Sequence, residues 1–232
     1  MPQIFHRSTN TISRFSLVLA IVAVLGFFFF TLEIQRSPYV SWKGVVREQP
    51  VPFSHEHHAG ELGIDCRYCH TGVETSSFAG IPPTKTCMNC HVQIWTNAEM
   101  LAPVRDSYKT GTPLVWTRVS LLPDFVYFDH SIHVAKGVGC ESCHGRVDRM
   151  PLMRSNATLQ MEWCLDCHRA PEKNLRPKSE VFNMAYEKPS SLKPVVVDDK
   201  NFTSQMALGV YLKDKYEVRS VRDITSCTTC HR

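Results

Sequence analysis

The chain of 232 residues carries a formal net charge of +4, and 43% of its residues are hydrophobic. Its length allows one ordinary domain or two small ones. The 10 cysteines and 11 histidines exclude an ordinary domain held by side-chain packing alone, because so many of these residues require metal, cofactor or disulfide chemistry.

A membrane helix is the first element expected along the chain. A run without any charged residue extends from Phe15 to Leu32. It is long enough for a tilted transmembrane helix and longer than the apolar region of a usual signal peptide. A cleaved signal peptide is the alternative, but the residues after Phe30 offer no small-x-small cleavage site. We therefore expect a cytoplasmic N-terminus at 1–14 and an uncleaved anchor at 15–34.

Prolines and polar residues dominate the next stretch. Pro38, Pro50 and Pro52 interrupt regular structure there, so the sequence predicts a tether at 35–52. Every cysteine lies after this tether, in residues 53–232.

All cysteines belong to the pattern C-x-x-C-H, which occurs five times. Two thiols three positions apart can each form a thioether to one haem vinyl group, and the next histidine then reaches the iron. The sequence therefore predicts five covalently bound haem c groups. Their attachment residues are Cys66 and Cys69, Cys87 and Cys90, Cys140 and Cys143, Cys164 and Cys167, and Cys227 and Cys230, and their proximal ligands are His70, His91, His144, His168 and His231.

Zinc sites and disulfides are the alternatives to haem. A tetrahedral zinc site takes cysteine pairs two at a time, whereas the chain holds an odd number of pairs. Neither zinc nor a disulfide framework requires a histidine after each pair. Both therefore explain the pattern less well than haem does.

Four of the motifs belong to a duplicated segment, and its two copies are called the first module (residues 53–91) and the second module (residues 128–168). Each module begins with F-x-H-x-x-H and continues with two haem motifs. The fifth motif, 227–231, stands alone. We expect the first histidine of each F-x-H-x-x-H to bind the haem attached just after it and the second to reach another haem. These distal ligands are His55, His58, His130 and His133.

Two histidines and one iron remain after this assignment. His6 precedes the apolar run and cannot reach a haem, and His57 has no counterpart in the second module, so it is expected to be solvated or to support a ligand. The iron without a distal histidine needs a methionine, unless it is open. The candidates in order of preference are Met150, Met161 and Met153, although a single methionine is more often a packing residue.

The haems themselves are expected to form most of the core, because five macrocycles leave little room for one made of side chains. The predicted fold class is a multihaem cytochrome c. It combines one N-terminal transmembrane helix with a mostly irregular or α-helical domain built around five covalent haems, with little β-structure. Short helices are expected at 202–212 and around each haem motif.

Covalent haem attachment also orients the chain. Because c-type haem is assembled outside the bacterial cytoplasmic membrane, residues after about 36 are expected on the periplasmic or outer face. The haem propionates offset the net charge of +4, so no nucleic-acid partner is expected.

The sequence between the motifs resembles a known family. The segments QPVPFSHEHHAGELGIDCRYCHTGVE, AGIPPTKTCMNCHVQIW, LPDFVYFDHSIHVAKGVGCESCHGRVDRMP and MEWCLDCHRAPE, together with the single anchor, are similar to the pentahaem cytochrome c subunit of alternative complex III. The resemblance covers almost the whole chain. That family is part of a bacterial quinol-oxidising complex in the cytoplasmic membrane.

The resemblance implies a non-catalytic subunit that conducts electrons. Quinol is oxidised in an integral membrane subunit, electrons pass through an iron–sulfur subunit, and this chain relays them to another cytochrome c or a terminal oxidase. Two other functions stay open: a stand-alone multihaem quinol dehydrogenase, and an enzyme that reduces a small nitrogen or sulfur oxyanion at an open iron.

Overall fold

The computed structural model describes residues 4–231, which divide into two units between Trp42 and Lys43. The first unit consists mainly of helix α1 (Thr9–Arg36), which is about 42 Å long at 1.5 Å per residue. A second, short helix, α2 (Pro38–Ser41), begins with a proline, whose fixed φ suits the first helical position.

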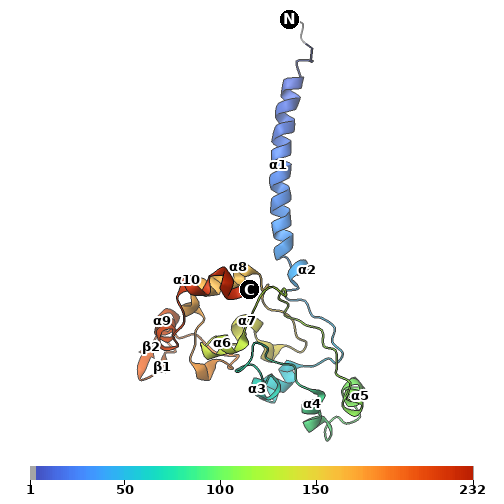
Figure 1. The fold of residues 1–232 in the computed structure, drawn as a ribbon, viewed down its shortest axis with the longest axis vertical. Helices are drawn as coiled ribbons and strands as arrows, with labels where there is room; N and C mark the ends of the chain where they lie inside the picture. The colour runs from blue at the N-terminus through green and yellow to red at the C-terminus, as the bar shows by residue number, and fades with distance from the viewer. Residues whose placement is uncertain (1–3, 232) are drawn as a thin grey trace. The chain divides into compact units, whose positions relative to one another are not determined.

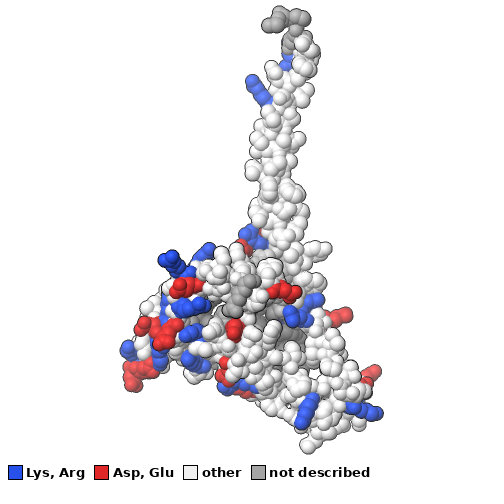
Figure 2. Space-filling view, viewed as in Figure 1, with Lys and Arg blue, Asp and Glu red and all other residues white. Residues whose placement is uncertain are grey.

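Helix α1 is long and apolar enough to cross a membrane. None of its side chains is buried, and Figure 2 shows a long central part of its surface without Lys, Arg, Asp or Glu. The helix extends beyond the anchor expected at 15–34 by six residues at its start and two at its end.

The second unit is built from short helices joined by irregular segments (Figure 1). Its α-helices are α3 (Cys66–Cys69), α4 (Thr84–His91), α5 (Ala102–Thr110), α6 (His130–Ala135), α7 (Glu141–His144), α8 (Met161–Arg169), α9 (Gln205–Lys215), α10 (Val221–Ile224) and α11 (Cys227–Cys230). Single turns of other helix types are η1 (Glu56–Glu61), η2 (Glu99–Leu101), η3 (Val147–Arg149), η4 (Pro171–Lys173) and η5 (Lys178–Glu180).

The sheet content is small, as the sequence predicted. Strands β1 (Val195–Val197) and β2 (Lys200–Phe202) pair antiparallel, with Val195 opposite Phe202. Short helices at the haem motifs are also confirmed, and α9 overlaps the helix expected at 202–212.

Local capping explains where several of the motif helices begin. The Asp65 carboxylate accepts a hydrogen bond from the Arg67 backbone N–H at the start of α3. Asp129 accepts from the N–H groups of Ser131 and Ile132 at the start of α6. These bonds satisfy N–H groups that have no partner inside the helix, so such short helices can form.

The expected tether differs from the structure in its second half. Lys43 and Val46 form isolated bridges with Ser155 and Arg154, and Val51 is buried. Residues 43–52 therefore belong to the second unit, because Lys43, Val46 and Val51 contact its other segments.

Side chains alone form only small cores. Among residues 4–231, ten apolar side chains are buried. Two clusters account for six of them: Val51 with Leu101 and Val104, and Leu175 with Leu208 and Leu212. A domain of this size normally buries far more apolar area, so the fold has room for large apolar groups besides its side chains.

Candidate haem-binding sites

Each C-x-x-C-H motif places its two cysteines one helical turn apart. Helices α3, α7 and α11 consist of little more than the motif itself, whereas α4 and α8 carry it at their C-terminal ends. Positions i and i+3 share one face of a helix, so both thiols of a motif face the same side. None of the ten cysteines forms a disulfide with another, so all ten can form thioethers.

Several of these thiols lie in apolar surroundings. Burial raises the pKa of Cys143 to about 12 and that of Cys140 to about 11, because a low dielectric disfavours the thiolate. Thiols of this kind are inert towards oxidants but well placed to face an apolar macrocycle.

Each distal histidine of the first module pairs with a proximal one. The ring centroids of His55 and His70 lie 6.4 Å apart with an interplanar angle of 6°. Those of His58 and His91 lie 6.2 Å apart at 65°.

The second module repeats this arrangement. His130 and His144 lie 6.3 Å apart at 6°, and His133 and His168 lie 6.1 Å apart at 28°. Two imidazoles on opposite sides of one metal, each at a metal–nitrogen distance of about 2 Å, place their centroids on the order of 6 Å apart. All four pairs therefore have the spacing that a shared iron requires.

The backbone fixes the tautomer of most of these imidazoles. Seven of them have Nδ1 within hydrogen-bond distance of a backbone carbonyl oxygen, which can only accept. These contacts are His58 to Ser54 (2.8 Å), His70 to Gly80 (2.7 Å), His91 to Ile94 (3.3 Å), His130 to Ser77 (2.8 Å), His133 to Asp129 (2.6 Å), His168 to Ile224 (2.7 Å) and His231 to Phe125 (3.1 Å). The proton then resides on Nδ1, and Nε2 keeps a lone pair for a metal.

Burial keeps three of the paired imidazoles neutral. It lowers the pKa of His55 to about 4, with further contributions from His70, His58 and His144. It also lowers the pKa of His144 to about 4 and that of His133. Since a metal binds neutral imidazole, these environments favour the ligating form.

One phenylalanine holds the two distal histidines of each module. Phe53 meets His55 edge-on at 4.9 Å and stacks on His58 at 4.4 Å. Phe128 does the same in the second module, at 4.8 Å from His130 and 4.6 Å from His133. The repeated spacing of F-x-H-x-x-H thus corresponds to the same packing of one phenylalanine on two histidines.

His57 lies outside these pairs. Its Nδ1 is 2.8 Å from the Glu61 carboxylate, its ring stacks on Trp95 at 6.2 Å, and its side chain is 46% exposed. It therefore stands beside His58 without facing a proximal histidine.

The fifth motif has a different environment. The His231 ring lies 5.8 Å from Phe125, and the Tyr127 N–H donates to the Cys230 carbonyl oxygen. Met150 is buried beside the first module, where its carbonyl oxygen accepts a hydrogen bond from the Glu56 N–H at 3.1 Å. Met161 is 66% exposed and begins α8, the helix that contacts α10 just before the fifth motif.

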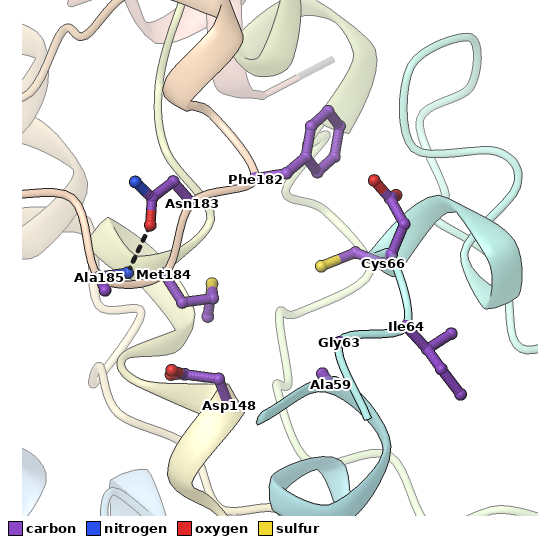
Figure 3. Close-up of a pocket in the computed structure, with 10 residues that line it drawn as sticks. Ala59, Gly63, Ile64, Cys66, Asp148, Phe182, Asn183, Met184 and Ala185 are labelled. Atoms are coloured by element: carbon purple, nitrogen blue, oxygen red, sulfur yellow. Dashed lines mark hydrogen bonds between the residues drawn. The ribbon is translucent and has the colours of Figure 1, made fainter. Parts of the chain in front are cut away.

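A cavity of about 310 Å³ adjoins the first motif (Figure 3). Its lining includes Cys66 from α3, Asp148 from η3, and Phe182 and Met184 from the segment after η5. In Figure 3 the Cys66 thiol points into this space. Together with the imidazole pairs, a cavity at a motif thiol fits covalent haem.

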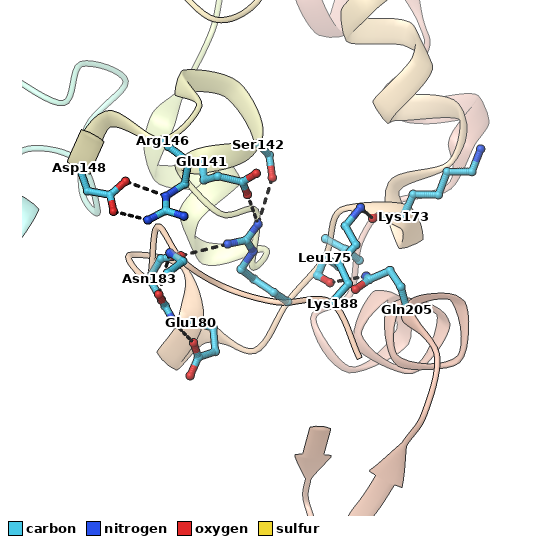
Figure 4. Close-up of polar contacts among 12 residues, drawn as sticks. Glu141, Ser142, Arg146, Asp148, Lys173, Leu175, Glu180, Asn183, Lys188 and Gln205 are labelled. Atoms are coloured by element: carbon cyan, nitrogen blue, oxygen red, sulfur yellow. Dashed lines mark hydrogen bonds and ion pairs between the residues drawn. The ribbon is translucent and has the colours of Figure 1, made fainter. Parts of the chain in front are cut away.

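Sequence reasoning missed one buried charge beside the third motif. Arg176 is 2% exposed, and its guanidinium donates to Glu141 at 2.7 Å and to Ser142 at 3.3 Å, both of which lie inside C-x-x-C-H (Figure 4). It also lies over the Tyr186 ring at 4.5 Å. No local pattern marks Arg176, because its partners are about 35 residues away in the sequence.

The zinc alternative finds no support in side-chain geometry. Within residues 4–231, no group of three or more His, Cys, Asp and Glu side chains lies close enough together to hold a metal ion. The histidines meet in pairs instead, which suits an iron whose other four ligands come from a porphyrin.

Comparisons with known proteins agree with this geometry. Residues 126–232, which hold three of the five motifs, match the family model described as cytochrome c7 and related cytochrome c. The chain is 36% identical over 99 residues to the multiheme cytochrome c subunit of menaquinone reductase from Nitratidesulfovibrio vulgaris. This match spans 42% of the chain and 46% of that relative. Residues 126–232 therefore have the sequence of a multihaem cytochrome c domain, and proteins of the cytochrome c class bind haem c covalently and transfer electrons.

Proposed function

We propose that this chain is an electron-transfer subunit with five covalent haem c groups, four of them ligated by two histidines. The observation that carries this proposal is the set of four imidazole pairs with centroids 6.1 to 6.4 Å apart. Each pair joins a proximal histidine to one from F-x-H-x-x-H. Haem supplies the reversible ferric/ferrous couple, and the chain's residues hold the iron six-coordinate and screen it from small ligands.

The haem content tests this proposal directly. Intact mass measurement of the purified chain should show five haem additions, and the pyridine haemochrome spectrum should give the same ratio. Fewer than five haems per chain would contradict it.

For the fifth iron, the surroundings favour Met161 over Met150. Met161 lies on α8, and α8 contacts α10, which directly precedes the helix of the fifth motif. Met150, the first choice from sequence, is buried against η1 at the first module. Met161→Ala should abolish the optical signature of a His/Met haem, whereas Met150→Ala should leave it. The opposite result would restore Met150.

We further propose that the chain works in a membrane complex that exchanges electrons with the quinone pool. The similarity to a menaquinone reductase subunit and the resemblance to the alternative complex III subunit both support this role. The expected partners are iron–sulfur and integral quinol-binding subunits, with another cytochrome c or a terminal oxidase as acceptor. Purification from native membranes should recover these subunits with the chain. Isolation of the chain alone, with quinol oxidised unaided, would instead support a stand-alone quinol dehydrogenase.

Helix α1 is proposed to anchor the chain in the cytoplasmic membrane, with the haem domain on the outer face. Its length and uninterrupted apolar surface support this role. The chain should stay in the membrane pellet after alkaline carbonate extraction, and protease added to spheroplasts should cleave the haem domain. Release of the full-length chain by carbonate would contradict the anchor.

The environment of His231 keeps one second function in view. No distal histidine faces this ring within residues 4–231, so an open fifth iron would permit reduction of a small oxyanion. Carbon monoxide added to the reduced protein distinguishes the two cases. Six-coordinate haems ignore it, whereas an open iron gives a shifted Soret band.

A further inference from the structure

The first and second motifs lie side by side. The Asn89 side chain, inside the second motif, donates to the Tyr68 hydroxyl, inside the first, at 2.9 Å. The two distal histidines that face these motifs, His55 and His58, are only three positions apart and share Phe53. The first module therefore forms one compact pair of sites.

The first motif also meets the second module. His130, which pairs with the third motif, directs its Nδ1–H and its backbone N–H to the Ser77 carbonyl oxygen, at 2.8 and 3.3 Å. The Ser131 N–H donates to the carbonyl oxygen of Ser76. Both serines lie in the loop that follows the first motif, so this loop packs directly on the distal helix α6 of the third site.

The third and fourth motifs are joined as the first and second are. His130 and His133 on α6 pair with the third and fourth motifs, respectively. Both of these histidines also pack on the Phe128 ring. The second module is thus a second compact pair.

The fifth motif adjoins the fourth. Nδ1–H of His168 donates to the Ile224 carbonyl oxygen at 2.7 Å, and Ile224 is the last residue of α10, just before α11. Figure 1 shows α8 and α10 side by side, and the two helices are in contact.

We infer that the five haem sites form one unbranched row in the order second, first, third, fourth, fifth. This inference rests on the proposed haem binding. The modules meet through their odd-numbered sites, so the order is reversed within the first module. The ends of the row are the second and fifth sites, where electrons must enter or leave if they travel its whole length.

The second site carries its own spectroscopic mark. Its imidazole planes, those of His58 and His91, are twisted by 65°, whereas the first and third pairs are at 6° and the fourth at 28°. Crossed axial planes bring two iron d orbitals close in energy, which raises the largest g value of the ferric haem. The end of the row at the second site is therefore identifiable in the spectrum.

Matched ligand variants of the full-length holoprotein test the order. A methionine thioether raises the potential of the haem that it ligates, so that haem is reduced first in a titration. Its changed charge then shifts the midpoints of its direct neighbours. His55→Met, at the first site, should shift two further haems, the second and the third. His58→Met, at the second site, should shift only the first. The readout is a redox titration followed by electron paramagnetic resonance.

A row in chain order predicts the reverse count, one neighbour for His55→Met and two for His58→Met, and that result would overturn the inference. His130→Met gives an independent decision if either variant assembles incompletely. Its neighbours should be the first and fourth sites, and a shift of the second in place of the first would also overturn the order. Intact mass separates the two levels: loss of haem in the unmodified chain contradicts the proposed function, whereas five haems coupled in another order contradict only the row.

Discussion

The first and third sites, one in each module, have nearly the same histidine geometry, whereas the second and fourth sites differ. His55 with His70 and His130 with His144 have nearly the same spacing and the same 6° angle. The second and fourth pairs differ, at 65° and 28°. Duplication has therefore kept the short segment from F-x-H-x-x-H to the next haem motif. What varies is the pair completed by a motif further along the chain.

Their electrostatic surroundings differ as well. At the same place in C-x-x-C-H, the first motif has Arg67 and the third has Glu141. Arg67 is about half exposed and pairs with Asp65 nearby. Glu141 pairs with Arg176, which is buried and comes from a distant segment. Arg67 also lies over the Phe182 ring at 4.5 Å. The connection 169–226 thus reaches both modules, at an exposed arginine in the first and through a buried arginine in the second.

The largest expected effect is the loss of a distal ligand. His55→Ala and His130→Ala should each leave one iron without its sixth ligand, so one haem of five becomes high-spin in either variant. Carbon monoxide should then bind a single haem, as measured by the reduced difference spectrum. His57→Ala is the matched control and should bind none. Equal binding in all three would show that these histidines are not ligands.

The next largest effect contrasts the two arginines. Arg176→Met should cost about 1.5 to 3 kcal/mol of unfolding free energy, because it removes a buried hydrogen bond to the carboxylate of Glu141, which is itself partly exposed. Arg67→Met should change it little, since that pair is solvated. Denaturant unfolding followed by Soret absorbance measures both. Equal losses of unfolding free energy in the two variants would contradict the difference between the buried and the exposed arginine.

A smaller effect is expected at the helix caps. Asp129→Ala should cost about 1 kcal/mol, because at the start of α6 the Ile132 N–H loses its acceptor and the Ser131 N–H keeps only the Ser76 carbonyl oxygen. Ser54→Ala, in the first module, should cost less, since its hydroxyl accepts only from the His57 N–H. The two free energies of unfolding can be compared in the same denaturant series. A larger cost at Ser54 would contradict the difference.

The smallest effect is a pH dependence that arises at Asp65, beside the first motif. The Arg67 side chain donates hydrogen bonds to Asp65 and lowers the pKa of that carboxyl to about 2. A folded pKa below the unfolded value of about 3.9 means that the pair stabilises the fold above that value and loses its contribution as the pH falls towards 2. Asp65→Asn should flatten the acid limb of unfolding free energy against pH. An unchanged limb would assign it to other carboxyls.

Sequence patterns predicted the local parts of these sites and missed the non-local ones. The motifs, the duplication and the four distal histidines follow from spacing over fewer than about 40 residues. The contact of Arg176 with Glu141 and that of His130 with Ser77 join segments with no shared pattern. Residues 43–52 were expected to be free of the domain because their prolines read as a linker, yet Val51 is buried. Such contacts depend on how irregular segments cross, which periodicity does not encode.

The bond from His130 to the carbonyl of Ser77 makes assembly of the domain conditional. The ring that completes the third site is oriented by a loop whose shape depends on the first motif. Loss of the first haem should therefore disturb the ligand of the third site, its direct neighbour in the proposed row. Haem loading at these two sites is then expected to be cooperative, although each site has its own attachment motif.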